Sequence, residues 1–378
     1  MRALPVLVDA TSVPPNRGGV ARYIAGLLDG LAALDVRVDV VVKPADLTWL
    51  RETAPTHRYH PAPTWTSSRP LRLVWEQLGL PGMLRRVGAD VLHSPHYTFP
   101  VLHAARTVVT LHDATFFSDP GAHSALKVRF FRAWTRLARR LARATVAPSA
   151  ATVAELDRLA GRPRRPTVVA HLGVDRGVFH PPTDDELRAF RAAHGMADGD
   201  DWIAFLGTVE PRKRLPELIA AHTALTAAEP ATPPLLVAGG FGWDDTARAL
   251  LERAGDHPGA PLRYLGYLPL EELRAFLGGS RAVVYPSIAE GFGLPVLEAM
   301  ASGADVLTTD RLAIPEVGGD TVTYTDPDAV PIQDALATML ADEPAARAAR
   351  ADRIARAGRR AAGFTWAACA ERHVEVYA

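Results

Sequence analysis

The chain has 378 residues, 48% of them hydrophobic and 22% charged, and a formal net charge of zero. This is the composition of a folded globular protein, and its single cysteine, Cys369, excludes an internal disulfide. No stretch reaches the roughly 18 apolar residues of a membrane span, and the first residues do not resemble a signal peptide, so we expect a cytoplasmic protein. The length exceeds what one hydrophobic core usually supports, which favours two domains.

The two halves of the chain carry opposite net charges, which sum to zero. Residues 1–178 carry 24 Lys and Arg against 13 Asp and Glu, a net charge of +11, and the remaining residues carry 18 against 29, a net charge of −11. This division agrees with two domains that meet near residue 180, and it gives the first half an affinity for anionic surfaces. We expect no nucleic-acid partner.

Apolar runs alternate with helical segments along the whole chain. In the first half we predict strands at 4–10, 36–42, 106–113 and 144–150, and helices at 19–34 and 125–144. In the second half we predict strands at 201–207, 233–240, 262–268, 281–287 and 304–310, and helices at 215–228, 246–255, 270–279 and 293–303. Short strands buried on both faces and joined by helices indicate parallel sheets, so we predict an α/β protein with two Rossmann-like domains and a linker at 171–187.

Two glutamates, Glu290 and Glu298, stand eight residues apart in "EGFGLPVLEAM". The first lies in the loop after the strand 281–287, and the glycines on either side of Phe292 allow close backbone approach to a ligand. The second lies in the following helix, whose N-terminus favours an anion. Because ligands of parallel sheets bind at the carboxyl ends of strands, we interpret this segment as a nucleotide-sugar site, although such a pair also occurs by chance.

A second cluster, "FLGTVEPRKR", follows the strand 201–207. It turns at Gly207 and places Arg212 and Lys213 before the next helix, where their cations are suited to a diphosphate. The alternative is an exposed basic turn. Gly18 and Gly19 open the first helix in the same way, but they lack the full dinucleotide spacing, so they indicate only a possible phosphate or acceptor loop.

These segments together carry a resemblance. "GTVEPRKR", followed about 80 residues later by "EGFGLPVLEAMASG", resembles the C-terminal half of family-four retaining glycosyltransferases of the GT-B fold, whose E-x7-E motif matches Glu290 and Glu298. The likeness extends to "RGGVARY", "TLHDATFF", "GVDRGVF" and the terminal "FTWAACAERHVEVY". It implies two Rossmann-like domains with a cleft between them: an acceptor domain at 1–178, on which a final helix at about 364–378 packs back, and a nucleotide-sugar domain at 179–363.

The resemblance also implies roles for single residues. Arg212 and Lys213 would hold the diphosphate of the donor, Glu298 the ribose, and Glu290 the hydroxyls of the sugar. His112 matches the active-site histidine of the family and would face the sugar; its alternative is a satisfied core histidine. The donor site would also include Gly18, Gly19, Gly207, Gly291, Phe292, Gly293 and Leu294.

The implied reaction is transfer of a sugar to an acceptor hydroxyl with retention, without a metal or another cofactor. Mannose, carried by GDP rather than UDP, and a glycan or lipid-linked acceptor are the expected substrates. The chain departs from the family at two points: Arg214 stands where asparagine is usual, and "ADVLTTD" follows "MASG" where a proline is common. A sugar-nucleotide epimerase and a non-catalytic nucleotide-sugar binding protein remain alternatives.

The predicted helix 125–144 is strongly basic. Residues 121–154 contain seven Lys and Arg and no acidic residue. An apolar stripe comprises Val128, Phe131, Trp134, Ala138 and Leu141, and the adjacent face carries Arg129, Arg132, Arg136, Arg139 or Arg140, and Arg143. Two interpretations are open: an ordinary domain helix, or a peripheral contact with the anionic inner face of the membrane.

Overall fold

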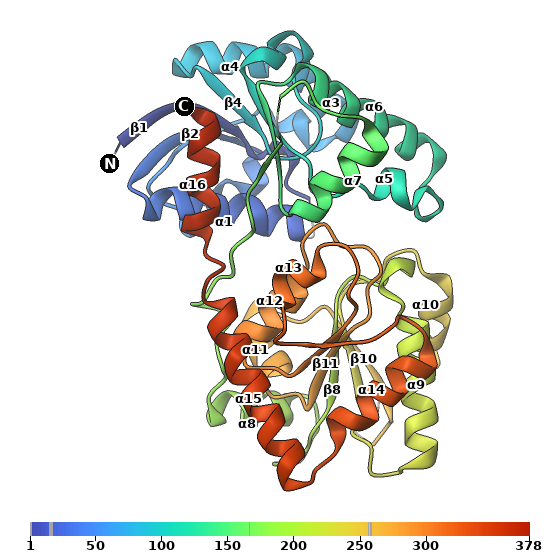
Figure 1. Ribbon diagram of the computed structural model, residues 1–378. Coiled ribbons are helices and arrows are strands. Elements are labelled where there is room, and N and C mark those ends of the chain that lie inside the picture. The colour runs from blue at the N-terminus through green and yellow to red at the C-terminus, as the bar shows by residue number, and fades with distance from the viewer. Residues whose placement is uncertain (1, 15–17, 166, 256, 258) are drawn as a thin grey trace. The chain divides into compact units, whose positions relative to one another are not determined.

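The computed structural model describes residues 2–14, 18–165, 167–255, 257 and 259–378. The chain divides into two compact units, one formed by Met1–Gly173 with Phe364–Ala378 and the other by Val174–Gly363 (Figure 1). Each unit is built on a single sheet in which all pairings between the named strands are parallel. The predicted α/β class with two Rossmann-like halves is therefore confirmed.

The first unit has seven strands in the order β3-β2-β1-β4-β5-β6-β7. The strands are β1 (Arg2–Asp9), β2 (Val36–Val42), β3 (Arg58–Pro61), β4 (Val91–Ser94), β5 (Thr107–Thr110), β6 (Ala144–Ala147) and β7 (Thr167–Val169). The α-helices are α1 (Gly19–Ala33), α2 (Leu47–Thr53), α3 (Arg69–Leu78), α4 (Leu80–Val87), α5 (Thr115–Ser118), α6 (Ala125–Leu141), α7 (Ala150–Ala160) and α16 (Trp366–Tyr377).

The second unit has six strands in the order β10-β9-β8-β11-β12-β13. The strands are β8 (Ile203–Leu206), β9 (Leu235–Ala238), β10 (Leu262–Gly266), β11 (Ala282–Tyr285), β12 (Val306–Thr308) and β13 (Thr323–Tyr324). The helices are α8 (Asp184–Ala193), α9 (Leu215–Ala228), α10 (Asp245–Glu252), α11 (Leu270–Gly278), α12 (Leu294–Ala301), α13 (Ile314–Gly318), α14 (Ala329–Leu340) and α15 (Pro344–Ala361).

Each sheet has one point at which the strand order reverses. In the first unit it lies between β1 and β4, and in the second between β8 and β11. Crossover connections leave such a pair of strands in opposite directions, so their loops separate and open a crevice at the carboxyl ends. The strands β8 and β11 are the ones that precede "GTVEPRKR" and "EGFGLPVLEAM", so both predicted donor segments follow strands at the reversal point.

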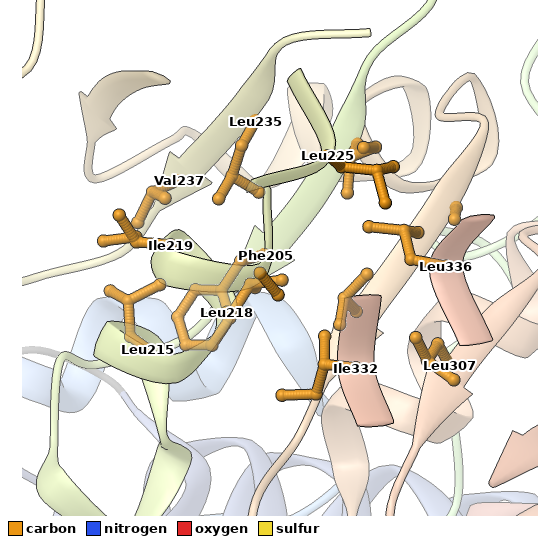
Figure 2. Close-up of a cluster of buried hydrophobic side chains, with 14 of the residues drawn as sticks. Phe205, Leu215, Leu218, Ile219, Leu225, Leu235, Val237, Leu307, Ile332 and Leu336 are labelled. Atoms are coloured by element: carbon orange, nitrogen blue, oxygen red, sulfur yellow. The ribbon is translucent and has the colours of Figure 1, made fainter. Parts of the chain in front are cut away.

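The core of the second unit explains why its apolar runs form strands. Every residue of β9 and β11 is buried, and side chains of β8, β9 and β12 pack against α9 and α14 (Figure 2). Leu215, Leu218 and Ile219 cover one side of Phe205, while Ile332 and Leu336 meet Leu307. Burying a side chain of this size contributes about 1.5–3 kcal/mol each. The core fixes the ends of β8 and β11, from which the candidate donor loops emerge.

Helix α16 packs along α1 within the first unit, and it appears beside α1 at the red end of the chain in Figure 1. Two glycines of α1 make the contact possible. A Cβ on Gly26 would lie 2.1 Å from the indole of Trp366, and a Cβ on Gly30 would lie 2.0 Å from its backbone oxygen. Trp366 therefore lies closer to the backbone of α1 than a side chain at position 26 or 30 would allow.

Four strands were absent from the sequence prediction: β3, β4, β7 and β13. Strands β7 and β13 have three and two residues, too few to show a period. Strand β3 is an exposed edge that includes Pro61, and the fully buried β4 includes His93 and Ser94. Their formation depends on pairing with neighbours rather than on an apolar pattern.

One face of helix α6 packs in the core of the first unit. Val128 and Ala138 are buried, and Phe131 and Trp134 pack against the core cluster around Phe99. Leu141 departs from the predicted apolar stripe, because 40% of its surface is exposed.

The two adjacent arginines of α6 differ in exposure. Arg139 is only 3% exposed, pairs with Asp157 and donates to the carbonyl of Gly161 at 2.7 and 3.0 Å. Arg140 is exposed. The exposed cations of this helix are Lys127, Arg129, Arg136 and Arg140.

Candidate active site

Two loops of the second unit meet at the reversal point of its sheet. One follows β8 and contains a short 3-10 helix at Pro211–Lys213, and the other follows β11 and leads into α12. The amide of Ile288 donates to the carbonyl of Arg212 at 2.9 Å. The structure therefore brings the predicted diphosphate segment and the first of the two glutamates to one place.

One oxygen of the Glu290 carboxylate is held by three donors. Oε1 accepts from the guanidinium of Arg212, from the hydroxyl of Tyr285 at 2.6 Å and from that of Ser287 at 2.8 Å. Oε2 makes no hydrogen bond to the part of the chain that the structure describes. Burial alone would raise the pKa of Glu290, but Arg212, Lys213 and the two hydroxyls hold it below its ordinary value. The group is an oriented carboxylate with one oxygen available to a ligand.

Arg212 and Lys213 differ in their partners. Arg212 lies between two carboxylates, donating to Glu210 at 2.7 Å and pairing with Glu290, and it also donates to the Ala289 carbonyl at 2.6 Å. Lys213 is 6% exposed, and its ammonium makes no hydrogen bond or ion pair within the described residues. Its ammonium lies 5.6 Å from the ring centroid of Tyr285.

The charge on Lys213 is therefore poorly compensated. Burial lowers the pKa of Lys213, the neighbouring guanidinium lowers it further, and the carboxylates of Glu290 and Glu210 only partly oppose them. A bound anion beside this ammonium would compensate the charge.

Two glycines shape the loops around these charges. Gly207 has a φ of 153°, and a Cβ built there would lie 2.4 Å from the ammonium of Lys213. Gly293 has a φ of 104°, a left-handed conformation that side chains disfavour, and it forms the N-cap of α12 without a side-chain hydrogen bond. The predicted phosphate loop of Gly291, Phe292, Gly293 and Leu294 thus leads directly into the positive end of a helix.

Glu298, the second glutamate, lies in the interior of α12 and is 2% exposed. It is not the solvated helix residue that its spacing alone permits. No hydrogen bond links it to the side chain of Glu290.

His112 belongs to the first unit and lies two residues after β5, which ends at Thr110 rather than at the predicted residue 113. Its Nε2 lies 2.7 Å from the carbonyl of Pro95, so Nε2 carries the proton and donates. Burial lowers the pKa of His112, although the Pro95 carbonyl and Asp113 oppose this effect. In the neutral ring Nδ1 is therefore an acceptor, and it has no hydrogen-bond partner among the described residues.

Gly18 and Gly19 also belong to the first unit, where they are the N-cap and first residue of α1. Among the described residues, no atom lies within 4 Å of a Cβ built on Gly19. The preceding part of the predicted glycine loop, residues 15–17, lies outside the described residues.

Sequence reasoning missed the two hydroxyls that anchor Glu290. Tyr285 and Ser287 lie in "RAVVYPS", which the apolar pattern assigned to a strand. A tyrosine and a serine at the carboxyl end of a buried strand were the available signal.

Arg214 has a backbone conformation that explains why the family usually has asparagine at this position. Its φ of 53° and ψ of 35° are left-handed, a region that asparagine tolerates better than arginine. The side chain forms ion pairs with Glu217 at 2.9 Å and Asp328 at 3.1 Å. The turn is thus formed without the usual asparagine.

In the described ranges, no group of three or more His, Cys, Asp and Glu side chains is arranged to hold a metal ion. Nor does that part of the chain contain a helix long and apolar enough to cross a membrane.

Comparison with known proteins agrees with this arrangement. Residues 17–177 match Glycosyltransferase Family 4, and residues 187–360 match Glycosyl transferases group 1. The O-antigen chain mannosyltransferase B of Escherichia coli is 30% identical over 287 residues, which cover 76% of this chain and 74% of that protein.

Two solved structures share the fold over the whole chain. Sucrose-phosphate synthase from Thermosynechococcus elongatus has a TM-score of 0.72 at 19% identity, covering 100% of this chain and 98% of that one. Anabaena HepE, solved in complex with UDP-glucose, has a TM-score of 0.70 at 19% identity and is covered to 98%, as is this chain. The chain therefore belongs to the family-four, group 1 glycosyltransferases, and its two Rossmann-like units are those of the GT-B fold.

Proposed function

We propose that the protein is a retaining glycosyltransferase that moves mannose from GDP-mannose to an acceptor hydroxyl in glycan or polysaccharide assembly. The observation that carries this proposal is the buried ammonium of Lys213, which has no ion-pair partner within the described residues. It lies beside the Glu290 carboxylate at the reversal point of a doubly wound sheet. A diphosphate supplies the missing negative charge, and a sugar hydroxyl supplies a donor to Oε2 of Glu290.

Each candidate residue has a distinct task in this proposal. Lys213 and Arg212 hold the diphosphate and stabilise its charge as the bond to the sugar breaks. The positive end of α12 contributes to the same stabilisation. Glu298 holds the ribose, and His112 accepts from a hydroxyl of the transferred sugar through Nδ1.

Retention and independence of metal are parts of the proposal that rest on family resemblance. The choice of mannose is supported by the mannosyltransferase relative. HepE was solved with UDP-glucose, so the donor base needs a direct test. A panel of GDP- and UDP-sugars, compared by thermal stabilisation and by hydrolysis, tests the donor; stabilisation by UDP donors alone would refute GDP.

The roles separate when binding and turnover are measured on the same variants. Lys213→Ala, Arg212→Ala and Glu298→Ala should weaken GDP binding about ten- to a hundredfold in calorimetry, since each removes a charged hydrogen bond. His112→Ala should leave GDP affinity nearly unchanged and lower transfer by about two orders of magnitude. The stereochemistry of the product, followed by NMR, tests retention.

Glu290 requires a more conservative change. Its carboxylate orients Arg212, so Glu290→Ala would disturb diphosphate binding as well as sugar binding. Glu290→Gln keeps an acceptor for the Tyr285 and Ser287 hydroxyls and should lower transfer more than GDP affinity. Normal transfer by this variant would refute the donor site, and conversion of the donor without acceptor would indicate an epimerase.

We also propose that α6 provides a peripheral contact with anionic lipid, where a lipid-linked acceptor would be found. Lys127, Arg129, Arg136 and Arg140 are exposed, and Leu126 at the start of the helix is 80% exposed. Cations near an anionic surface contribute about 1 kcal/mol each.

Vesicle sedimentation at low salt tests this contact. The wild type should sediment with phosphatidylglycerol vesicles more than with phosphatidylcholine vesicles, and Arg136→Glu with Arg140→Glu should abolish the difference. Arg85→Glu with Arg86→Glu, two exposed arginines of α4, makes the same charge change in the same unit and is the matched control. Equal recovery of wild type with both vesicles contradicts the membrane role.

A further inference from the structure

A chain of buried hydrogen bonds connects α16 to the helix and strands that surround His112. It runs through five side chains from four elements: Tyr377 and His373 of α16, His93 of β4, Thr110 of β5 and Tyr23 of α1. All five are nearly fully buried, so each polar atom must find its partner inside the protein.

The carbonyl of Cys369 determines which atom donates in every hydrogen bond of this network. Nδ1 of His373 lies 2.8 Å from the oxygen of Cys369, which only accepts, so Nδ1 carries the proton. Burial lowers the pKa of His373 to about 4, so the ring is neutral and its Nε2 accepts from the hydroxyl of Tyr23 at 2.7 Å.

The remaining bonds are then determined. The Tyr23 oxygen accepts from Thr110 at 2.8 Å, and Thr110 accepts from Nε2 of His93 at 2.9 Å. Nδ1 of His93 accepts from Tyr377 at 2.8 Å. Each donor is used once, and the Tyr23 hydroxyl is fixed from two sides.

The ring of Tyr23 in turn contacts His112. The two rings meet edge to face, with centroids 5.0 Å apart and an angle of 84°. His112 has one hydrogen bond, from Nε2 to Pro95, which leaves its ring free to tilt about that bond unless packing prevents it. Tyr23 packs against the ring from α1 at the shortest of three ring distances, since the centroids of His96 and Tyr97 lie 6.0 and 6.1 Å from that of His112.

We infer that Tyr23 is a positioning residue for His112, and that α16 holds Tyr23 in place through His373. The inference rests on the proposed role of His112 in sugar transfer. It gives the end of the chain a part in the reaction, although His373 is 350 residues from Tyr23 in sequence. Edge-to-face packing fixes the direction in which Nδ1 of His112 points, and misplacement by about 1 Å can lower a rate a hundredfold.

The test compares two tyrosines of the same network. Tyr23→Phe removes the hydroxyl that fixes the ring against His112, whereas Tyr377→Phe removes a hydroxyl at the far end of the network. Two-bond ¹H–¹⁵N NMR spectra report the tautomer of His112 directly in the full-length protein. We expect Tyr23→Phe to shift and broaden the His112 signals while Nε2 stays protonated through its bond to Pro95, and Tyr377→Phe to leave the signals unchanged.

Kinetics with GDP-mannose should show the same division. Tyr23→Phe should lower kcat about tenfold with KM for the donor within about twofold, because positioning and not donor binding is lost. His373→Leu should behave like Tyr23→Phe, and His373→Gln, which retains an acceptor for the hydroxyl, should restore the wild-type spectrum.

An unchanged His112 spectrum in Tyr23→Phe overturns the inference, and so does an equal shift in Tyr377→Phe, which would indicate a general structural role. If the wild type turns over no donor, the proposed function fails, while the spectra still decide whether Tyr23 positions His112.

Discussion

Lys213 and Arg212 are adjacent cations that differ in their carboxylate partners. The guanidinium has two carboxylate partners, while the buried ammonium has none within the described part of the chain. A buried cation that is only partly compensated destabilises the unliganded fold, and a bound anion offsets that cost. The structure therefore indicates that Lys213 depends more on a bound anion than Arg212 does. The sequence alone did not distinguish the two residues.

Replacing this ammonium by an apolar chain of similar length separates stability from binding. Because the lowered pKa of Lys213 shows that the folded state disfavours its charge, Lys213→Met should raise the free energy of unfolding without ligand. GDP at a hundred times its Kd should stabilise the wild type by about 2.7 kcal/mol, and the variant far less. Thermal unfolding with and without GDP measures both effects; a less stable variant that keeps the GDP effect would contradict this account.

At the scale of elements, α16 joins the first unit by lying against the glycines of α1. The indole and backbone of Trp366 occupy the places where Gly26 and Gly30 would carry Cβ atoms. A Cβ of Gly173 would lie 2.2 Å from the amide of Trp366, so a second segment is equally close. Gly26 and Gly30, four residues apart on α1, thus allow α16 to pack closely against α1.

The glycine at position 30 should be intolerant of a methyl group. Gly30→Ala places the Cβ 2.0 Å from a backbone oxygen, which cannot move without displacing α16, so we expect a loss of about 1–3 kcal/mol or more. Gly82→Ala in α4 is the control, since no atom lies within 4 Å of its Cβ. Urea denaturation compares the two variants, and equal stabilities would show that α16 does not depend on this contact.

At the scale of the whole molecule, buried titratable groups act on stability in opposite directions. Burial lowers the pKa of His373 to about 4 and raises the pKa of Glu76 to about 7, the latter despite Arg72 at 3.0 Å. Between pH 7 and 5 the unfolded chain takes up a proton at His373 that the folded chain does not, which destabilises the fold. At Glu76 the folded chain takes up the proton, which stabilises it.

The contributions of His373 and Glu76 to the pH dependence of stability nearly cancel in the wild type. Substituting Glu76 should make the contribution of His373 measurable. From the two pKa values, lowering the pH from 7 to 5 costs about 2 kcal/mol at His373 and returns about 2 kcal/mol at Glu76. Glu76→Gln removes the second contribution, so the variant should lose about 2 kcal/mol more than the wild type over this range. Denaturation at both pH values tests the difference, and parallel losses would contradict the assignment to Glu76.

The sequence by itself determined the class of fold, the strands that carry the chemistry and the family. The strand within 233–240 is apolar on both faces, which a sheet covered by helices accommodates, and β2 formed over the predicted residues 36–42. The loops after β8 and β11 were readable because their glycines and charges are contiguous in the chain. The roles assigned to Glu290, Glu298 and His112 remain predictions.

Only the tertiary structure decided how those residues are held. That Tyr285 and Ser287 anchor Glu290, and that Arg139 is buried while Arg140 is exposed, depends on neighbours that no local pattern specifies. The bond between Tyr23 and His373 joins residues 350 positions apart. Periodicity and motifs report short-range preferences, whereas the orientation of a side chain is set by packing and hydrogen bonding between segments that meet only after folding.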